Sequence, residues 1–337
     1  MAPPRDVCEG RDSDPSEIGL QMIPGPWSTM SSCNQTRITE FVLLGIQGSM
    51  GLKYSLFALL SVTYIFTIAG NVLIIVLVLR SDKLHTPMYF FLCHLSFSDI
   101  LLSTNVAPYL LCMLIGKCKS ILVSSCLTQY FFGSSSAVSE CFLLTAMSYD
   151  RYLAICSPLH YKTIMHMKFC IHLVVWSWSL VCLLNLSSVI LMSRMEFCGC
   201  NIIDDLYCDH APLLNASCSD TSIIELETII FSIPIVLFPF LFVIMTYIRI
   251  FIAILKISTI SGRRKAFSTC SSHMIVVAIY YGTLIAKYTA PPSGSSLNVN
   301  KVISLLYTVF TPLLNPAVYS LRNREIKEAM QKWVHVN

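Results

Sequence analysis

The sequence carries little charge for its length. Asp, Glu, Lys and Arg make up only 12% of the 337 residues, whereas hydrophobic residues make up 55%. A soluble domain usually contains about 25% charged residues. One buried core cannot absorb so many apolar residues, so much of the apolar surface must face lipid. The basic residues are also spread along the chain rather than gathered in one tract, which argues against a nucleic-acid partner. The chain is predicted to be an integral membrane protein.

The sequence also lacks the short motifs of common enzymes. It contains no H-E-x-x-H, G-x-S-x-G or P-loop pattern. An intramembrane aspartyl protease could use Asp150, but it would need a second Asp in a glycine-rich setting, and Asp99 lacks that setting. A proton-coupled carrier could use Asp99 and Glu140 as a relay, but no internal repeat is visible. The chain is therefore predicted to be neither an enzyme nor a transporter.

Long apolar runs stand in place of these motifs. A helix needs about 20 apolar residues to cross the hydrocarbon core, and seven segments qualify: 54–79, 87–116, 124–156, 169–193, 228–248, 266–286 and 302–321. No signal peptide is expected, because the apolar stretch in the tail is short and broken by Pro24 and Pro26. Lys and Arg are more numerous on one side of these segments, which predicts an extracellular N-terminus and a cytoplasmic C-terminus.

The cysteines support this orientation. Six of the 15 lie in or beside the loops on the predicted outer side: Cys118, Cys126, Cys198, Cys200, Cys208 and Cys218. A cysteine-rich exposed loop is typical of an oxidising compartment, where disulfides form. A zinc site is the alternative, but the stretch Cys198-Gly199-Cys200 lacks the ligand arrangement of a zinc knuckle.

Four stretches resemble one known family. LHTPMYFFLCHLSFSD (84–99), MSYDRYLAICSPLHY (147–161), KAFSTCSSHM (265–274) and PLLNPAVYSLRN (312–323) are similar to the signatures of vertebrate olfactory receptors, which are rhodopsin-like G-protein-coupled receptors. The motifs occur in the family's order and at the expected helix ends, and the resemblance spans residues 34 to about 328. It implies an all-α membrane protein, a seven-transmembrane helix bundle followed by a short amphipathic C-terminal helix.

The resemblance suggests how the chain is divided. Residues 1–53 are expected to form an extracellular tail, 54–322 the seven-transmembrane receptor domain and 323–337 a short cytoplasmic tail. Residues 1–29 are polar and interrupted by prolines, and are predicted to be disordered. Asn34-Gln35-Thr36 is a glycosylation sequon on the predicted outer side, as is the stretch that begins at Asn215.

An acid lies beside a base at the end of the third apolar run, at Asp150-Arg151. Such a pair is neutral as a whole, yet the arginine can extend into water or donate to a partner's carbonyl groups. The pair therefore permits two states of similar free energy, as a switch requires. The alternative is an interface anchor, which would be favoured for a lone arginine.

The resemblance gives this pair a role in G-protein coupling. It implies that Asp150 holds Arg151 in the silent state, and that Arg151 reaches towards a stimulatory, olfactory-type G protein in the active state, which raises cyclic AMP. The other residues that it assigns to the switch are Tyr152, Tyr247, Asn315, Pro316 and Tyr319. The two later tyrosines would move inward, and the Asn-Pro pair would be the hinge of the last helix.

The resemblance also assigns the cysteines. It implies a disulfide from Cys126, at the start of the third helix, to Cys208 in the long loop that follows the fourth helix. It implies a second disulfide, Cys198–Cys218, within that loop. Cys118 and Cys200 are additional to the family's usual outer cysteines, and a third bridge between these two is a further expectation.

Similar receptors bind odorants in the outer half of the bundle, and a pocket for small, mostly apolar volatiles should be apolar with few polar groups. In the third segment, Ser134, Ala137, Val138 and Cys141 share one helical face by their spacing. The other positions at which similar receptors contact ligand are Phe231, Ser232, Ile235, Tyr281, Leu284, Tyr288, Leu305 and Thr308. Plain helix packing is the alternative reading for each of them.

No charged group is expected in this pocket. Glu227 and Lys287, at the outer helix ends, are expected to face headgroup water. A neutral volatile is therefore the favoured ligand. The expected partners are this odorant, the olfactory-type G protein and membrane lipid, and the expected location is the plasma membrane.

Asp99 and Glu140 are two carboxyl groups in the middle of predicted helices, where no Lys or Arg lies at comparable depth. Two neighbouring carboxylates in low dielectric cannot both stay ionised without a counter-charge. Similar receptors suggest a sodium ion here that stabilises the silent state, aided by oxygens of Ser139 and Asn315, and hard oxygen ligands suit such an ion. A protonated pair is the alternative. No cofactor is expected to be required.

Overall fold

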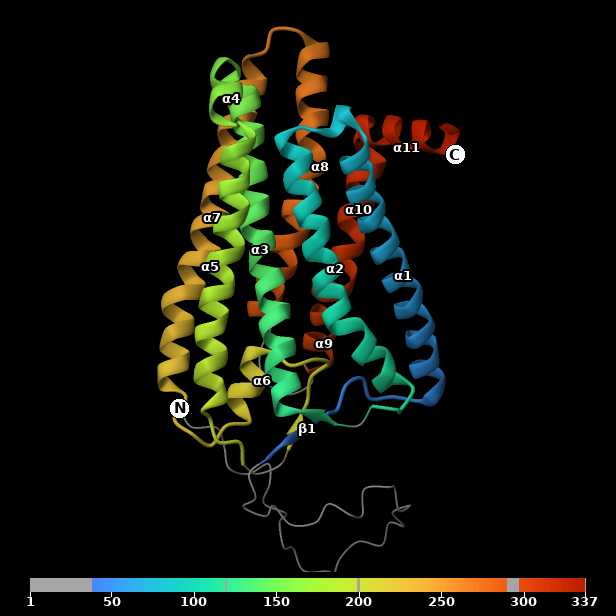
Figure 1. Ribbon diagram of the computed structural model, residues 1–337, viewed down its shortest axis with the longest axis vertical. Helices are drawn as coiled ribbons and strands as arrows, with labels where there is room; N and C mark the ends of the chain where they lie inside the picture. The colour runs from blue at the N-terminus through green and yellow to red at the C-terminus, as the bar shows by residue number, and fades with distance from the viewer. Residues whose placement is uncertain (1–37, 119, 199–200, 290–296, 337) are drawn as a thin grey trace, which may run out of the picture.

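The computed structural model describes residues 38–118, 120–198, 201–289 and 297–336. Within these ranges the chain forms an elongated bundle of long helices (Figure 1). The predicted sequon at Asn34, the cysteine at position 200 and the segment 1–29 lie outside the described residues.

Seven helical passages run along the bundle in the described part of the chain. The first six are α1 (Met50–Arg80), α2 (Pro87–Leu114), α3 (Val123–Cys156), α5 (Met167–Ser193), α7 (Ser222–Lys256) and α8 (Ile260–Thr289). The seventh consists of α9 (Leu297–Leu305), the π-helical segment η4 (Leu306–Phe310) and α10 (Thr311–Arg322). Each predicted apolar segment lies on one of these passages. The passages α7 and α8 extend well beyond the prediction, because polar residues continue a helix outside its apolar run.

The seventh passage lacks one backbone hydrogen bond within α10. Pro316 has no N–H to donate to the carbonyl of Pro312, one turn earlier. Asn71 of α1 replaces this bond, since its Nδ2 donates to the Pro312 carbonyl at 3.1 Å. Gly70 permits the close approach, because a Cβ there would lie 3.2 Å from the Pro316 ring. The seventh passage is therefore held to α1 at the point where its own hydrogen bonding is interrupted.

Six of the described passages are long and apolar enough to cross a membrane: α1, α2, α5, α7, most of α8 and the seventh passage. The helix α3 is not among them, because polar side chains lower its mean hydropathy. These side chains are buried, and include Ser136, Ser139, Glu140 and Asp150. The helix packs against α2, α5, α7 and α8. It is therefore the central helix, surrounded by helices rather than lipid.

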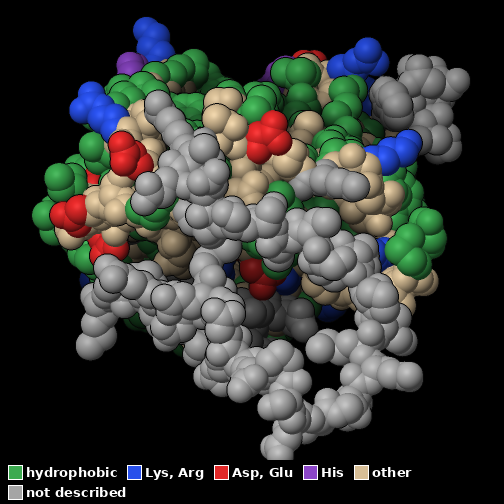
Figure 2. Space-filling view, turned by 90° about the horizontal axis from the view of Figure 1, so that it is seen from below, with side chains coloured by type: hydrophobic (Ala, Val, Ile, Leu, Met, Phe, Trp, Pro, Cys, Tyr) green, Lys and Arg blue, Asp and Glu red, His purple; other side chains and the backbone are tan. Residues whose placement is uncertain are grey.

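One end of the bundle is closed by a small sheet and three disulfides; we call it the disulfide end. The strand β1 (Glu40–Leu43) pairs antiparallel with β2 (Ile121–Leu122) and parallel with β3 (Ile202–Ile203). The short helix α6 (His210–Asn215) lies beside them. The described disulfides are Cys112–Cys118, Cys126–Cys208 and Cys198–Cys218. Figure 2 looks onto this end, where charged and apolar side chains are interspersed.

The structure corrects one predicted bridge. Cys118 is bonded to Cys112, with 5.4 Å between their Cα atoms, and so cannot pair with Cys200. The reason is local. Gly116 has a φ of 71°, a left-handed conformation that glycine adopts readily, and it reverses the chain directly after α2. Cys118 therefore returns to the last turns of the same helix.

The opposite end carries α11 (Arg324–Val336), which points sideways from the bundle, roughly perpendicular to its long axis (Figure 1). We call this the α11 end. Also here are η2 (Asp82–Leu84), α4 (Pro158–Ile164) and the turn between α7 and α8. The helix α11 is amphipathic, as expected from the resemblance, since Ile326 is buried while Glu325 and Lys327 are exposed. Tyr89 of α2 donates to Glu325 at 2.6 Å and holds α11 against the bundle.

Candidate functional site

A cavity of about 90 Å³ opens among the helices near the disulfide end. It is lined by residues of α2, α3, α7, α8 and η4, and by the loop residues 207–209. Most of its lining is apolar, as is typical of small-molecule sites. Five of the predicted ligand contacts line it: Ser134, Ala137, Val138, Leu284 and Thr308.

The other predicted contacts do not line this cavity. Cys141, Ile235 and Tyr281 lie next to one another: the Cys141 sulfur is 3.0 Å from the Tyr281 hydroxyl and contacts the Ile235 carbonyl oxygen at 3.8 Å. Leu305 is buried in a cluster with α1 and α2. Phe231 lies on α7 with 41% of its side chain exposed. The side chains of Ser232 and Tyr288 lie outside the described ones.

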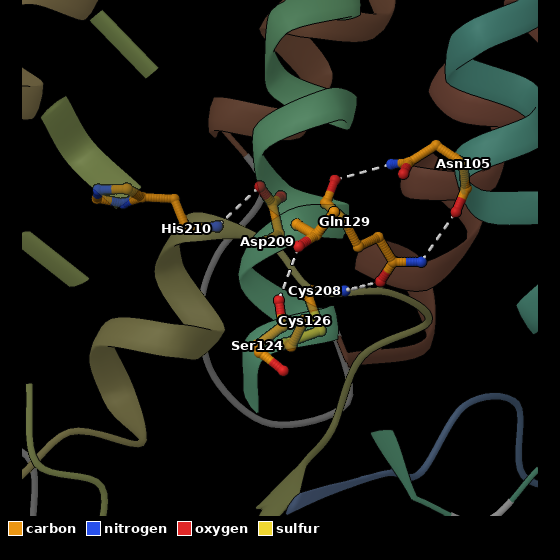
Figure 3. The surroundings of a disulfide bond; sticks show 8 residues. Asn105, Ser124, Cys126, Gln129, Cys208, Asp209 and His210 are labelled. Carbon is orange, nitrogen blue, oxygen red and sulfur yellow. Dashed lines mark hydrogen bonds between the residues drawn. A yellow bond between two sulfur atoms is a disulfide. The ribbon is translucent and has the colours of Figure 1, made fainter. Parts of the chain in front are cut away.

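The disulfide Cys126–Cys208 fixes the loop that covers the cavity. It ties this loop to the start of α3, and the side-chain oxygen of Gln129 accepts the Cys208 N–H at 2.9 Å (Figure 3). Gln129 is itself fixed by two bonds exchanged with Asn105 of α2, at 2.8 and 3.0 Å. Tyr207, Cys208 and Asp209 are thereby held against the cavity.

The structure also corrects the expected place of Lys287. Instead of facing headgroup water it lines the cavity, and its ammonium lies 2.5 Å from the Asp209 carboxylate and 2.7 Å from the Tyr207 hydroxyl. Sequence reasoning missed this contact because it depends on the loop folding inward over the helices. Burial alone would raise the pKa of Asp209, but the Lys287 charge outweighs it and the pKa lies below its ordinary value. The cavity therefore contains an ion pair.

Glu227 does not simply face headgroup water either. It accepts hydrogen bonds from Ser187 and Ser188 of α5, at 2.5 and 3.2 Å. It therefore joins α5 to α7 near the disulfide end, and it is not among the residues that line the cavity.

Asp99 and Glu140 are fully buried halfway along α2 and α3. The Nδ2 of Asn315 donates to both Asp99 oxygens at 3.0 Å. Among the described residues, Glu140 Oε1, Asn315 Oδ1 and Ser136 Oγ are buried without a hydrogen-bond partner. These free oxygens are the ligand type that a hard cation prefers. No group of three or more His, Cys, Asp or Glu forms a metal site in the described ranges, so an ion held by these two carboxyl groups would also need amide and hydroxyl oxygens as ligands.

At the α11 end, Asp150 and Arg151 form an ion pair, with 2.7 Å between Oδ2 and Nη2. Asp150 is completely buried, and the Tyr161 hydroxyl of α4 donates to its other oxygen at 2.8 Å. Burial and the neighbouring Asp150 charge raise the pKa of Tyr161 above its ordinary value. The Tyr161 hydroxyl therefore stays protonated and acts as the donor. The arginine Nε is buried and has no partner in the described part of the chain.

Three tyrosines of the predicted switch lie near this pair. Tyr319 is buried, and its hydroxyl has no partner among the described residues. Tyr247 is hydrogen-bonded to His273 of α8, and their rings stack. Tyr152 stacks on Tyr149 and packs against α7 and α8. Sequence reasoning did not single out His273, although it lies within the quoted KAFSTCSSHM stretch, and it also overlooked the contact from Tyr161.

Known proteins match this chain in sequence and in fold. The olfactory receptor family model matches residues 60–336. Human olfactory receptor 6B1 is 44% identical over 299 residues, which cover 89% of this chain and 96% of that protein. Rat olfactory receptor 1468 is 44% identical over 301 residues, with 89% and 96% covered. The crystal structure of squid rhodopsin superposes with a TM-score of 0.62 at 17% identity, over 86% of this chain and 88% of that one.

The two kinds of comparison agree. The match to squid rhodopsin extends over 86% of this chain and shows the rhodopsin fold. The family match begins within α1 and ends at the close of α11. The chain therefore belongs to the olfactory receptor family, and is a multi-pass membrane receptor and not an enzyme.

Proposed function

We propose that this protein is an odorant receptor that binds a small, mostly apolar volatile in the cavity and activates a stimulatory, olfactory-type G protein, which raises cyclic AMP. One observation carries this proposal: the cavity and the Asp150–Arg151 pair lie on the same continuous helix. Ser134 lines the cavity, and Arg151 lies 17 residues further along α3. At 1.5 Å per residue the two are about 25 Å apart, so the binding site and the coupling site are separate.

The location of the cavity supplies a mechanism for activation. Tyr307 and Thr308 belong to the π-helical η4 and line the cavity. A ligand therefore contacts the seventh passage where its helical pattern is interrupted, and π-helical turns are frequent at functional sites. A ligand that favours one arrangement of this segment shifts the population of the whole passage. Tyr319, near the other end of that passage, would then move relative to Arg151.

We also propose that the receptor lies in the plasma membrane with the disulfide end and the N-terminus outside. Disulfides form in the extracellular and secretory environment, and the three described bridges all lie at this end. Lys and Arg near the helix ends are more numerous on the α11 side, which matches the bias towards cytoplasmic loops. The predicted glycosylation of Asn34 requires the same orientation.

A sodium ion between Asp99 and Glu140 is part of this proposal as a modulator of the silent state. The buried free oxygens of Glu140, Asn315 and Ser136 suit a hard cation. The ion would supply the counter-charge that lets both carboxylates stay ionised without water. Asn315 already donates to Asp99, so movement of the seventh passage would alter the site.

The test is a cyclic AMP assay on cells that express the full chain, an olfactory-type Gα subunit and a surface epitope tag. At least one odorant mixture should raise cyclic AMP. Val138→Trp should fill the cavity and abolish this response at unchanged surface expression. The matched control is Val175→Trp, since Val175 is 56% exposed on α5, and it should respond normally. Silence of the surface-expressed receptor towards every odorant would contradict the proposal. A normal response by Val138→Trp would place the ligand elsewhere.

A further inference from the structure

Lys287 and Asp209 bring opposite charges to an otherwise mostly apolar cavity. They are the one cation and the one acid among the described lining residues. The Lys287 side chain is 21% exposed and that of Asp209 27%, so neither is sealed inside the protein. Lys287 also lies over the rings of Tyr207 and Tyr307, at 5.2 and 5.5 Å from their centroids. These contacts hold the ammonium at the cavity wall.

The stability of the fold does not by itself explain the Lys287–Asp209 ion pair. A buried ion pair stabilises a fold little better than apolar residues of similar volume, because both charges lose their hydration. The same end of the bundle contains a second pair, Lys301 with Asp204, which does not line the cavity. Lys301 also donates to the Gly45 carbonyl and so ties the segment between β1 and α1 to the seventh passage. The Lys301 pair has this evident structural role, whereas Lys287 and Asp209 face the binding site.

The hydrogen bonds of Lys287 leave one donor for a ligand. An ammonium has three N–H groups. Within the described residues, one is directed at the Asp209 carboxylate and one at the Tyr207 hydroxyl. The third N–H needs an acceptor whenever a ligand displaces water from the cavity, because an unpaired buried donor is costly.

The charge of Asp209 determines which acceptor fits. Asp209 already neutralises Lys287 at 2.5 Å, so a ligand carboxylate would approach a second negative charge, and like charges in a poorly hydrated site repel. A hydrocarbon would leave the third N–H unpaired. A neutral carbonyl oxygen accepts the hydrogen bond without adding charge.

We propose that Lys287 is the specificity-determining residue of the cavity, and that it selects compact, neutral ligands with a carbonyl oxygen, namely aldehydes, ketones or esters. This inference rests on the proposed odorant-receptor function. The carbonyl oxygen accepts from Lys287, and the apolar body lies against Ala137, Val138 and Leu284. A cavity of about 90 Å³ favours short chains.

The test uses three matched ligand series in the cyclic AMP assay: straight-chain aldehydes and methyl ketones from butanal and butanone to octanal and octanone, the corresponding terminal alkenes, and the corresponding carboxylic acids. The wild-type receptor should respond to members of the carbonyl series at about tenfold lower concentration than to the matched alkenes or acids, as expected for one hydrogen bond to a charged donor.

Two variants and one control make the test specific. Asp209→Asn removes the repulsion, so carboxylic acids should become agonists at about tenfold lower concentration. Lys287→Met combined with Asp209→Asn leaves no unpaired charge, and should remove the advantage of carbonyl compounds over alkenes. Lys301→Met combined with Asp204→Asn deletes the ion pair that does not line the cavity, and should leave the order of the ligand series unchanged.

The outcomes separate this inference from the proposed function. Two results overturn the inference even if other odorants activate the receptor. The first is that no member of the carbonyl series raises cyclic AMP. The second is that the order of the ligands is unchanged in the Lys287→Met, Asp209→Asn double variant. A reordering by the Lys301 control equal to that of the cavity variants also overturns it, because the effect would then be general. Silence towards all odorants at normal surface expression overturns the proposed function itself.

Discussion

The two ends of the bundle are held together by different kinds of interaction. Within the described residues, the disulfide end has three covalent bridges, a three-stranded sheet and the Lys287 and Lys301 ion pairs. At the α11 end the described cysteines, which include Cys93, Cys156, Cys170 and Cys270, are free thiols. Hydrogen bonds and the Asp150–Arg151 pair hold that end instead.

The difference suits the proposed function, in which one end binds the ligand and the other couples to the G protein. A ligand site must keep its shape, and covalent bridges and a paired loop fix the cover of the cavity. A coupling site must change its shape, and the α11 end retains buried polar groups that are not paired in the described chain, such as Arg151 Nε and Tyr319 Oη. Unpaired buried groups are costly, so a second arrangement that pairs them lies close in free energy. The following predictions test this contrast.

The largest effect is expected from breaking the long-range bridge. Cys126 and Cys208 are 82 residues apart, and Cys112 and Cys118 are 6 apart. Loop-closure entropy then gives about 4.5 kcal/mol for the first bridge and about 2 kcal/mol for the second. Cys126→Ser with Cys208→Ser should abolish surface expression, and Cys112→Ser with Cys118→Ser should reduce it only partly. Equal expression of the two double variants by flow cytometry would contradict this ranking.

The second largest effect is expected on G-protein coupling, when Arg151 is replaced. Arg151→Ala should reduce odorant-stimulated cyclic AMP to the background of cells without receptor, while surface expression stays near normal, because the residue lies at the α11 end and makes no contact with the cavity. Arg80→Ala removes an exposed arginine at the end of α1 and serves as the control, with normal signalling expected. Full signalling by Arg151→Ala would show that the pair is only an anchor.

A smaller effect of opposite sign is expected at Tyr161. Tyr161→Phe deletes the hydroxyl that donates to Asp150. A hydrogen bond to a charged group contributes about 1.5–3 kcal/mol, so the silent arrangement should be destabilised and basal cyclic AMP should rise severalfold. Tyr149→Phe is the matched control, because the Tyr149 ring stacks on Tyr152 and makes a tilted contact with Phe242, and Phe keeps this ring. A basal level unchanged from wild type would mean that Tyr161 does not restrain the switch.

A weaker effect, dependent on sodium, is expected on basal signalling from the buried Asp99 and Glu140, midway between the two ends. Raising sodium at constant ionic strength should lower basal signalling of the wild type, and Glu140→Gln should reduce this dependence without loss of surface expression. Potassium serves as the control cation. If basal activity ignores sodium in both proteins while the ligand response remains, the buried carboxylates are a protonated structural pair.

The smallest effect is a pH dependence at the disulfide end. Burial raises the pKa of Asp205 to about 6 from 3.8, with Asp209, Lys287 and Lys301 as its charged neighbours. The folded protein thus binds this proton more tightly than the unfolded chain, so the stabilisation is present at low pH and is lost between about pH 4 and pH 6. Asp205→Asn should flatten that part of the curve of melting temperature against pH for the purified receptor. An identical slope in the variant would assign it to other groups.

Features set by local sequence could be predicted, and features set by loop packing could not. Hydropathy located the seven helical passages, and the resemblance supplied Ser134, Ala137, Val138, Leu284 and Thr308, which line the cavity. These assignments need only helical periodicity and alignment with similar helices.

The errors arose where the chain folds back on itself. Cys112 belongs to an apolar helix, and its pairing with Cys118 depends on the turn at Gly116. The position of Lys287 at a helix end suggested headgroup water, and only the inward fold of the loop places Asp209 beside it. The bond from Tyr161 to Asp150 likewise requires α4 to return to α3. Sequence periodicity carries no information on such long-range contacts.

The parallel pairing of β1 with β3 has a consequence for biosynthesis. The strand at Glu40–Leu43 is made early, but its partner at Ile202–Ile203 follows only after α1, α2, α3 and α5 have been translated. During that interval β1 lacks the neighbour to which the Val42 N–H and the Leu44 N–H donate. Closing a chain segment this long costs entropy that local contacts cannot repay in advance. The sheet at the disulfide end can therefore be completed only after four of the seven helical passages have been translated.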